Sequence, residues 1–412
     1  MKLKYKDIKY VFFTIFNIIF FIGLTPVFSK YSLLGLGKIN KIYTIIIYSI
    51  TLILLFKNFI KIFILKKKFY LNKIFIFIIF ISIFSIIVSS EKSETFFSCL
   101  KLLTLAMYSV EIVDFYQVNS IIKNLLISQV IICILVLVFQ FTNFNNAIEF
   151  YEGKVVWNSS FYSKNSLAIE MALGCIISYL YFFRIRKGLF SIIVFITSGF
   201  ILIKTGSATS ILIVLVSILI EKIIFFIEEK YKVNINIVNF MYILNVIFYL
   251  FIFFFNKYNN IFEKIFNRDL TLTGRTYIWE GVLKTIPYNL LFGTGYETFW
   301  GYNEVLEQNI MQYYYPILHK RIIGAHNGFL DLILQIGIIG TIFFLYVLWS
   351  YGKKANFLKN NISKTFFYMY IVYLLMFFIT ERSLGSSSYQ TFLLFISLEI
   401  VQNEFGKRRK NE

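Results

Sequence analysis

The chain has 412 residues, of which 58% are hydrophobic and 20% aromatic, and its formal net charge is +19. Its apolar residues form runs of membrane length, which excludes an ordinary soluble domain. A basic chain can bind nucleic acid, but among so many apolar runs the lysines are better explained as topology signals on the cytoplasmic side. We therefore expect membrane lipids and no nucleic acid as partners.

The apolar runs predict helices, because a backbone inside a bilayer must form its own hydrogen bonds. The predicted spans are residues 10–29, 42–60, 74–90, 96–113, 121–141, 166–183, 188–204, 208–227, 237–256, 329–350, 364–380 and 389–403. The fold class is thus all-α, a polytopic bundle of about 12 transmembrane helices. We expect one membrane domain, residues 1–412, in the cytoplasmic membrane.

The positions of the lysines and arginines predict the orientation of the spans. Alternation from a cytoplasmic N-terminus places most basic connections inside; the exception is the connection near Lys30, Lys38 and Lys41. The basic groups predicted inside are Lys2 to Lys9, Lys66 to Lys73, Arg184 to Lys187, Lys230 to Lys232, Lys353 to Lys364 and Lys407 to Lys410. Both termini are therefore expected in the cytosol.

Cofactor signals are absent from the sequence. Cys99, Cys133 and Cys175 lie in or beside apolar runs and lack metal or redox spacing, so we interpret them as small apolar fillers. No carboxylate pair has metal-like spacing, and neither a Walker pattern nor GxGxxG occurs. We predict no metal and no cofactor.

Two long connections, residues 142–165 and 257–328, fall on the predicted outer face. Long loops on a rigid scaffold commonly carry function. We predict that residues 257–328 form an extracytoplasmic catalytic loop of helical character before the last three spans.

Both histidines of the chain lie in this loop, and His326 lies where the loop enters the membrane. Histidine can take a proton from a hydroxyl near neutral pH, although a hydrogen-bonding histidine at a helix start is the simpler alternative. Arg275, Lys320 and Arg321 could bind a phosphate group or anchor the loop to anionic lipid head groups.

Several aromatic side chains of the loop could stack on sugar rings or form an interfacial aromatic belt. They are Tyr277, Trp279, Tyr296, Trp300 and Tyr302. A charged pair, Glu381-Arg382, follows the eleventh span, where charges are either functional or paired with each other or with the loop.

The loop resembles the O-antigen ligase and polymerase superfamily of bacterial envelope polysaccharide enzymes. The matching stretches are Gly274-Arg275 with Trp279, Gly293 to Tyr296, and His326 to Leu330 with Gly337 and Gly340. Weaker matches are Phe161 with Lys164-Asn165, Thr205 to Ser210, and Thr380 to Arg382. The resemblance covers roughly residues 155–385.

The resemblance implies a metal-independent, inverting glycosyl transfer from a polyprenyl-diphosphate-linked oligosaccharide to a sugar hydroxyl. It implies that His326 activates the acceptor and that Arg275 holds the diphosphate. The family often has an arginine after the serine that precedes the eighth span, where this chain has Ala208, and nearby Lys204 is the candidate substitute. We predict substrate contacts from Lys204, Lys320, Arg321, Arg382, Trp279, Tyr296 and Asn327.

The missing arginine favours a polymerase of capsule, exopolysaccharide or O-antigen repeat units. The alternative within the family is a ligase that moves a glycan to a lipid or protein acceptor. A third alternative is a flippase or transporter, for which charged residues deep in the spans would be needed; Glu111 and Glu170 are the main candidates. A chain-length regulator is the one protein partner we consider.

Overall fold

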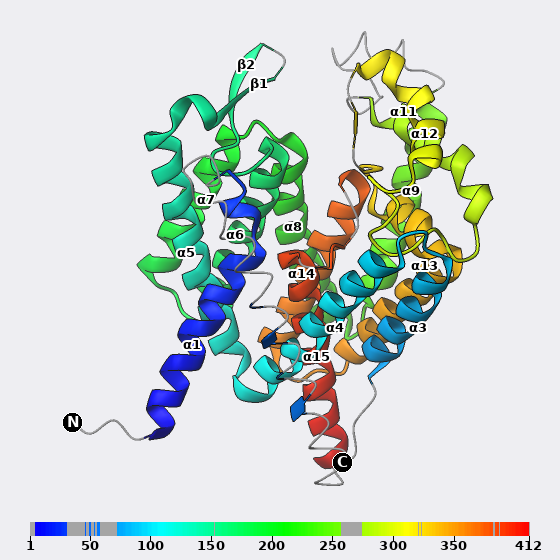
Figure 1. The fold of residues 1–412 in the computed structure, drawn as a ribbon. Helices are drawn as coiled ribbons and strands as arrows, with labels where there is room; N and C mark the ends of the chain where they lie inside the picture. The colour runs from blue at the N-terminus through cyan, green and yellow to red at the C-terminus, as the bar shows by residue number, and fades with distance from the viewer. Residues whose placement is uncertain are drawn as a thin grey trace.

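The computed structural model describes residues 5–30, 46, 49–50, 53, 56–57, 72–151, 153–256, 274–319, 321–322, 324–381, 384–386 and 388–411. Over these residues the chain is all-α, with 13 α-helices and one two-stranded hairpin. Figure 1 shows the helices running roughly side by side, with the start of α1 and the end of α15 at the same end of the bundle.

The helices agree with the predicted spans to within five residues at each end, except that α15 extends eight residues further. Most of the predicted span 42–60 lies outside the described residues. In the first half they are α1 (Tyr5–Leu24), α3 (Lys73–Val88), α4 (Lys92–Phe115), α5 (Val118–Thr142), α6 (Lys164–Arg184), α7 (Leu189–Lys204) and α8 (Ala208–Tyr231). In the second half they are α9 (Ile237–Asn256), α13 (Gly328–Ala355), α14 (Asn361–Thr380) and α15 (Tyr389–Asn411).

Six of the described helices are long and apolar enough to cross a membrane: α4, α5, α6, α8, α13 and α14. Four shorter apolar segments lie in α1, α3, α7 and α9. A chain with this many apolar helices is a multi-pass membrane protein.

Helix α14 forms the centre of the bundle, enclosed by α6, α8, α9, α13 and α15 (Figure 1). In the most apolar stretch of α14, 89% of the residues are buried inside the protein, whereas in the corresponding stretch of α8 only 39% are buried. Because α14 has hardly any lipid-facing side, its two ends are the places where polar groups from several helices can meet.

Two structures project beyond one end of the bundle (Figure 1). One is the hairpin of β1 (Ile148–Tyr151) and β2 (Lys154–Trp157), antiparallel, with Phe150 opposite Val155. The other is a pair of helices, α11 (Arg275–Thr285) and α12 (Glu304–Leu318). We predicted a helical loop before the last three spans, but we did not predict the hairpin.

Helix α13 is broken near its start, at Gly337, whose φ is 68° and ψ 179°. The segment from Leu290 to Gly295 fills the break: the N–H groups of Thr294 and Gly295 donate to the carbonyls of Leu334 and Gln335, at 3.0 and 2.9 Å. A broken helix at membrane depth requires such partners for its freed backbone groups.

The glycines on both sides of the break permit this close approach. A Cβ on Gly337 would lie 2.2 Å from the carbonyl oxygen of Leu291, and one on Gly293 would lie 2.5 Å from Gln335 backbone atoms. The glycines Gly293 and Gly337, which the sequence marks as motif residues, thus serve backbone packing.

Candidate functional site

The Glu381 carboxylate, at the C-terminal end of α14, is the meeting point of three other polar side chains. Arg275, the first residue of α11, donates from Nη2 to Glu381 Oε1 at 3.1 Å. The two side chains are only 11% and 13% exposed. An ion pair so little exposed to solvent is poorly screened, so each charge strongly affects the other.

The His326 imidazole faces the same carboxylate. Its Nδ1 lies 3.6 Å from Glu381 Oε2, a separation that allows an ion pair when the ring is protonated but is too long for a hydrogen bond. Nδ1 is buried and has no hydrogen-bond partner among the described residues. The side chain as a whole is nevertheless 30% exposed, so a part of it other than Nδ1 is open to solvent.

Asn165 completes the cluster from a third direction. Its Nδ2 donates to Glu381 Oε1 at 3.3 Å. Asn165 lies in the first turn of α6, which begins after the N-cap Ser163, whose hydroxyl accepts from the N–H of Ser166. In the same turn the Lys164 ammonium lies 3.1 Å from the centre of the Tyr151 ring, which ties the hairpin to α6 beside the cluster.

The backbone around His326 is held by buried hydrogen bonds. Trp279 donates from Nε1 to the carbonyl of Ala325 at 3.0 Å. The Asp331 carboxylate accepts from the N–H of Ala325 at 3.0 Å and from Trp300 Nε1 at 2.8 Å. His326 itself has φ of +47°, an unusual conformation for a residue other than glycine. Such conformations persist where the surroundings enforce them.

Three predicted substrate contacts are buried and engaged inside the protein. Asn327 is the N-cap of α13, accepting from the N–H groups of Phe329 and Leu330, and it donates to Tyr249 at 2.8 Å. Trp279 stacks edge-on against Tyr249, so neither of these two predicted residues offers an open surface to a sugar. Their observed contacts orient the segment that carries His326.

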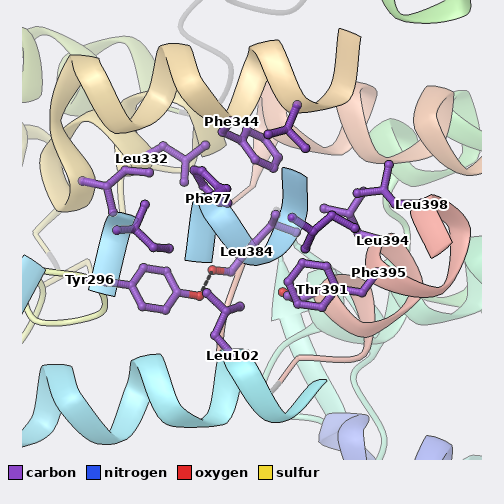
Figure 2. Close-up of a pocket in the computed structure, with 14 residues that line it drawn as sticks. Phe77, Leu102, Tyr296, Leu332, Phe344, Leu384, Thr391, Leu394, Phe395 and Leu398 are labelled. Atoms are coloured by element: carbon purple, nitrogen blue, oxygen red, sulfur yellow. Dashed lines mark hydrogen bonds between the residues drawn. The ribbon is translucent and has the colours of Figure 1, made fainter. Parts of the chain in front are cut away.

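The third buried residue, Tyr296, donates from its hydroxyl to the carbonyl of Leu384 at 3.0 Å. Burial raises the pKa of this hydroxyl well above its ordinary value, so it stays a neutral donor. Figure 2 shows Tyr296 at one end of an apolar pocket, with the hydrogen bond to Leu384 as a dashed line.

This pocket lies between α3, α4, α13 and α15. Side chains such as Phe77, Phe344 and Phe395 form its wall (Figure 2), and almost all of its lining is apolar. It therefore offers no chemistry of its own, and Tyr296 and Leu384 are among the residues that line it.

The other predicted cations that the structure describes, Arg321 and Lys204, have contacts elsewhere. Arg321 donates to the buried Glu307 carboxylate at 2.7 Å, and this hydrogen bond raises the pKa of the guanidinium. The ammonium of Lys204, at the end of α7, lies 5.5 Å from the centre of the Phe200 ring. Lys320 and Arg382 lie outside the described residues.

The two acids considered for a transporter differ in their surroundings. Glu111 forms an ion pair with Lys57. Glu170 is fully buried in α6, and neither carboxylate oxygen has a hydrogen-bond partner among the described residues.

From the sequence, Glu381 was noted only as a charge at the end of a predicted span, and Asn165 only as part of a weaker match to the family. Neither was among the predicted site residues, and the buried Asp331 and its partner Trp300 were not predicted as a support for His326. The available signal was position: each lies within or beside a stretch that resembles the family, at the end of a predicted span.

Comparisons with known proteins confirm the predicted resemblance to the O-antigen ligase and polymerase superfamily. Residues 193–345 match the family described as O-antigen ligase. This range includes Arg275 and His326 but not Asn165 or Glu381. The match thus includes α11, α12 and the break in α13, and it contains two of the four side chains of the cluster.

Two curated relatives match a shorter stretch. The chain is 30% identical over 100 residues to "Exopolysaccharide production protein ExoQ" of Rhizobium meliloti (strain 1021), which is 23% of this chain and 22% of the relative. It is 28% identical over 99 residues to "Putative polysaccharide ligase" of Rickettsia felis (strain ATCC VR-1525 / URRWXCal2), 24% of each. The matches therefore span about a quarter of these relatives. No solved structure matches the chain significantly.

Proposed function

From this resemblance, we propose that the protein is a membrane glycosyltransferase that polymerises oligosaccharide repeat units carried on a polyprenyl diphosphate. The observation that carries the proposal is the convergence of Arg275 and His326 on the Glu381 carboxylate. A guanidinium suits a diphosphate and an imidazole suits a hydroxyl, which are the two groups that such a transfer must handle.

In the proposed reaction, His326 takes the proton of the acceptor hydroxyl through the exposed part of its ring. The imidazolium that forms has Glu381 Oε2 3.6 Å from its Nδ1, so the carboxylate stabilises the new charge and orients the ring. The low exposure of Glu381 strengthens this effect, because little water screens it.

Arg275 handles the leaving group. As the acceptor oxygen bonds to the anomeric carbon from the opposite face, the bond from that carbon to the diphosphate oxygen breaks, and its electron pair leaves with the diphosphate. The configuration is inverted, and the proton is on His326. Fixed positive charge beside the departing diphosphate lowers the barrier, with one such contact worth on the order of 10²–10³ in rate.

The proposed placement is the cytoplasmic membrane, with about a dozen crossings, both termini in the cytosol and residues 257–328 outside. The start of α1 and the end of α15 lie at one end of the bundle, opposite the α11–α12 pair (Figure 1), which supports an even number of crossings. The cluster would then face the compartment in which the lipid-linked chains are assembled.

The test uses the full-length protein, reconstituted in vesicles with a synthetic lipid-linked repeat unit. We expect His326→Ala and Arg275→Ala to remain folded in the membrane and to produce no long polymer. Lys284→Ala removes an exposed cation from the same helix as Arg275 and should behave as wild type. Wild-type chain lengths in both site variants would refute the proposal.

A ligase is the second candidate, because the matched family is described as O-antigen ligase and one relative is named a polysaccharide ligase. The same cluster could serve either reaction, since only the acceptor differs. Loss of a polymerase leaves single repeat units in the cell, whereas loss of a ligase leaves polymer on the carrier lipid.

A further inference from the structure

The segment from Leu290 to Glu297, which we call the bracing segment, connects the two parts of the chain that carry the cluster. On one side it lies in the break of α13, the helix that begins directly after His326-Asn327. On the other side it contacts Leu384 and Ser386, which follow Glu381 by three and five residues in the connection between α14 and α15.

The contact with α13 is made largely by backbone. The N–H of Ile338 donates to the carbonyl of Leu290 at 2.9 Å, and Thr294 and Gly295 donate in the other direction to Leu334 and Gln335. The N–H of Glu297 then donates to the side chain of Gln335 at 2.9 Å. The bracing segment is therefore fixed to α13 along its whole length.

The contact with the α14–α15 connection is made by side chains. The Glu297 carboxylate holds Ser386 with both oxygens: Oε1 accepts from the Ser386 N–H at 2.6 Å and Oε2 accepts from the Ser386 hydroxyl. Tyr296 adds its hydrogen bond to the carbonyl of Leu384. Two charge-assisted hydrogen bonds to one residue fix both distance and orientation.

The backbone of Glu297 is in an unfavourable conformation, with φ of +61°. A residue with a side chain adopts the left-handed region at a cost, and it is retained where the surrounding contacts enforce it. A glycine would meet the backbone requirement more easily but could not bind Ser386. The position therefore needs a carboxylate in a place where the backbone favours glycine.

We propose that Glu297 is a positioning residue, which sets the separation between the His326 imidazole and the Glu381 carboxylate by tying the start of α13 to the α14–α15 connection through Gln335 and Ser386. This inference rests on the proposed function, because it assigns Glu297 to the geometry of that reaction. Glu297 itself contacts no reacting group in this account.

The size of the effect follows from the sensitivity of proton transfer to geometry. A displacement of about 1 Å in a catalytic group can reduce the rate roughly 10²-fold. Loosening the α14–α15 connection would also weaken the interaction between the imidazolium and Glu381, which is already 3.6 Å long. Substrate binding through Arg275 would change less, because the hydrogen bond from Trp279 to the carbonyl of Ala325 holds α11 in addition to the contact of Arg275 with Glu381.

The experiment measures kcat, KM for the lipid-linked donor and the pH–rate profile of reconstituted Glu297→Ala, Glu297→Gln and Ser386→Ala. For Glu297→Ala we expect kcat to fall about 10²-fold with KM within about twofold. The pH–rate profile is recorded as a second readout, because a purely structural role of Glu297 would leave the shape of the profile unchanged. The kcat of Ser386→Ala should lie between the kcat of Glu297→Ala and that of the wild type.

Glu297→Gln preserves the shape of the side chain and one acceptor for the Ser386 N–H, so it should lose less than 10-fold in kcat, by roughly the net value of one hydrogen bond. Glu280→Gln is the control, because Glu280 is exposed and its carboxylate forms an i,i+4 ion pair with the exposed Lys284. Its kcat and pH profile should match wild type.

The inference is overturned if folded Ser386→Ala and Glu297→Gln both keep the wild-type kcat and pH profile, even if Glu297→Ala fails to fold. It is also overturned if the variants raise KM without lowering kcat. Failure of the proposed function would be distinct, because His326→Ala would then retain activity whatever the Glu297 variants do.

Discussion

The two ends of α14 carry similar groups in different arrangements. At the start of the helix, Lys364 donates to Glu228 Oε2 at 2.6 Å, and the other oxygen of Glu228 accepts from the N–H of Ile235 at 3.1 Å. Tyr368 closes the arrangement by donating to the carbonyl of Ile235 at 3.0 Å. This network satisfies its own charges and joins α8, α9 and α14.

At the other end, Glu381 also binds a cation, Arg275, and a polar neighbour, Asn165, but one polar atom of the cluster has no hydrogen-bond partner among the described residues. His326 Nδ1 faces the carboxylate at 3.6 Å without a hydrogen bond, and His326 adopts a positive φ. Buried polar groups are normally paired, and exceptions cluster at functional sites. The two ends therefore differ in pairing. The charged groups at the start of α14 are bound to each other, whereas at its end His326 Nδ1 has no hydrogen-bond partner among the described residues.

The largest expected effect is that of Glu381→Gln. The amide can still accept from Arg275 and Asn165, so the fold should persist, but it cannot stabilise an imidazolium. We expect kcat to fall roughly 10²–10⁴-fold, measured as polymer formed by reconstituted protein. Glu228→Gln, at the other end of α14, should leave the kcat of the folded fraction unchanged. Equal losses of kcat in both variants would erase the distinction between the two ends.

An effect on stability and not on rate is expected for Lys364→Ala. Lys364 and Glu228 are 8% and 11% exposed, so removing the cation leaves a nearly buried carboxylate unpaired. This should lower the free energy of unfolding by roughly 3–5 kcal/mol, at the upper end if no water reaches the carboxylate, measured by denaturant titration in detergent micelles. Wild-type stability would show that the network at this end is not what holds the helices together.

The smallest expected effect is that of Asn165→Ala. Its hydrogen bond to Glu381 is long, at 3.3 Å, and Arg275 still binds the same oxygen. We expect kcat to fall roughly 2- to 10-fold, the net value of one hydrogen bond, with unchanged stability. A loss as large as that of Glu381→Gln would instead place Asn165 in direct contact with substrate.

Much of the fold could be predicted from the sequence. Apolar runs of membrane length must be helices, because the bilayer offers the backbone no other partner, and the predicted ranges agree with the described helices. The glycines Gly293 and Gly337 also stood out, although only the structure shows that each allows the backbone of the other segment to approach.

The candidate site was predictable only in part. Arg275 and His326 were selected through the family resemblance, because the residues alone left a lipid-anchoring role open for Arg275 and a hydrogen-bonding role open for His326. Trp279, Tyr296 and Asn327 were predicted to contact substrate, whereas the structure buries all three and gives them hydrogen bonds that orient the backbone. Side-chain type alone does not distinguish an aromatic ring that binds sugar from one that supports a loop.

Apolar runs and residue chemistry are local properties of the chain, so they were enough to predict a helical membrane protein and to direct attention to the connection before α13. The packing of the helices was needed to show that Glu381 lies beside Arg275, His326 and Asn165, and that Glu297 binds Ser386. Those contacts join residues far apart in the chain, and their distances depend on how the helices pack around α14.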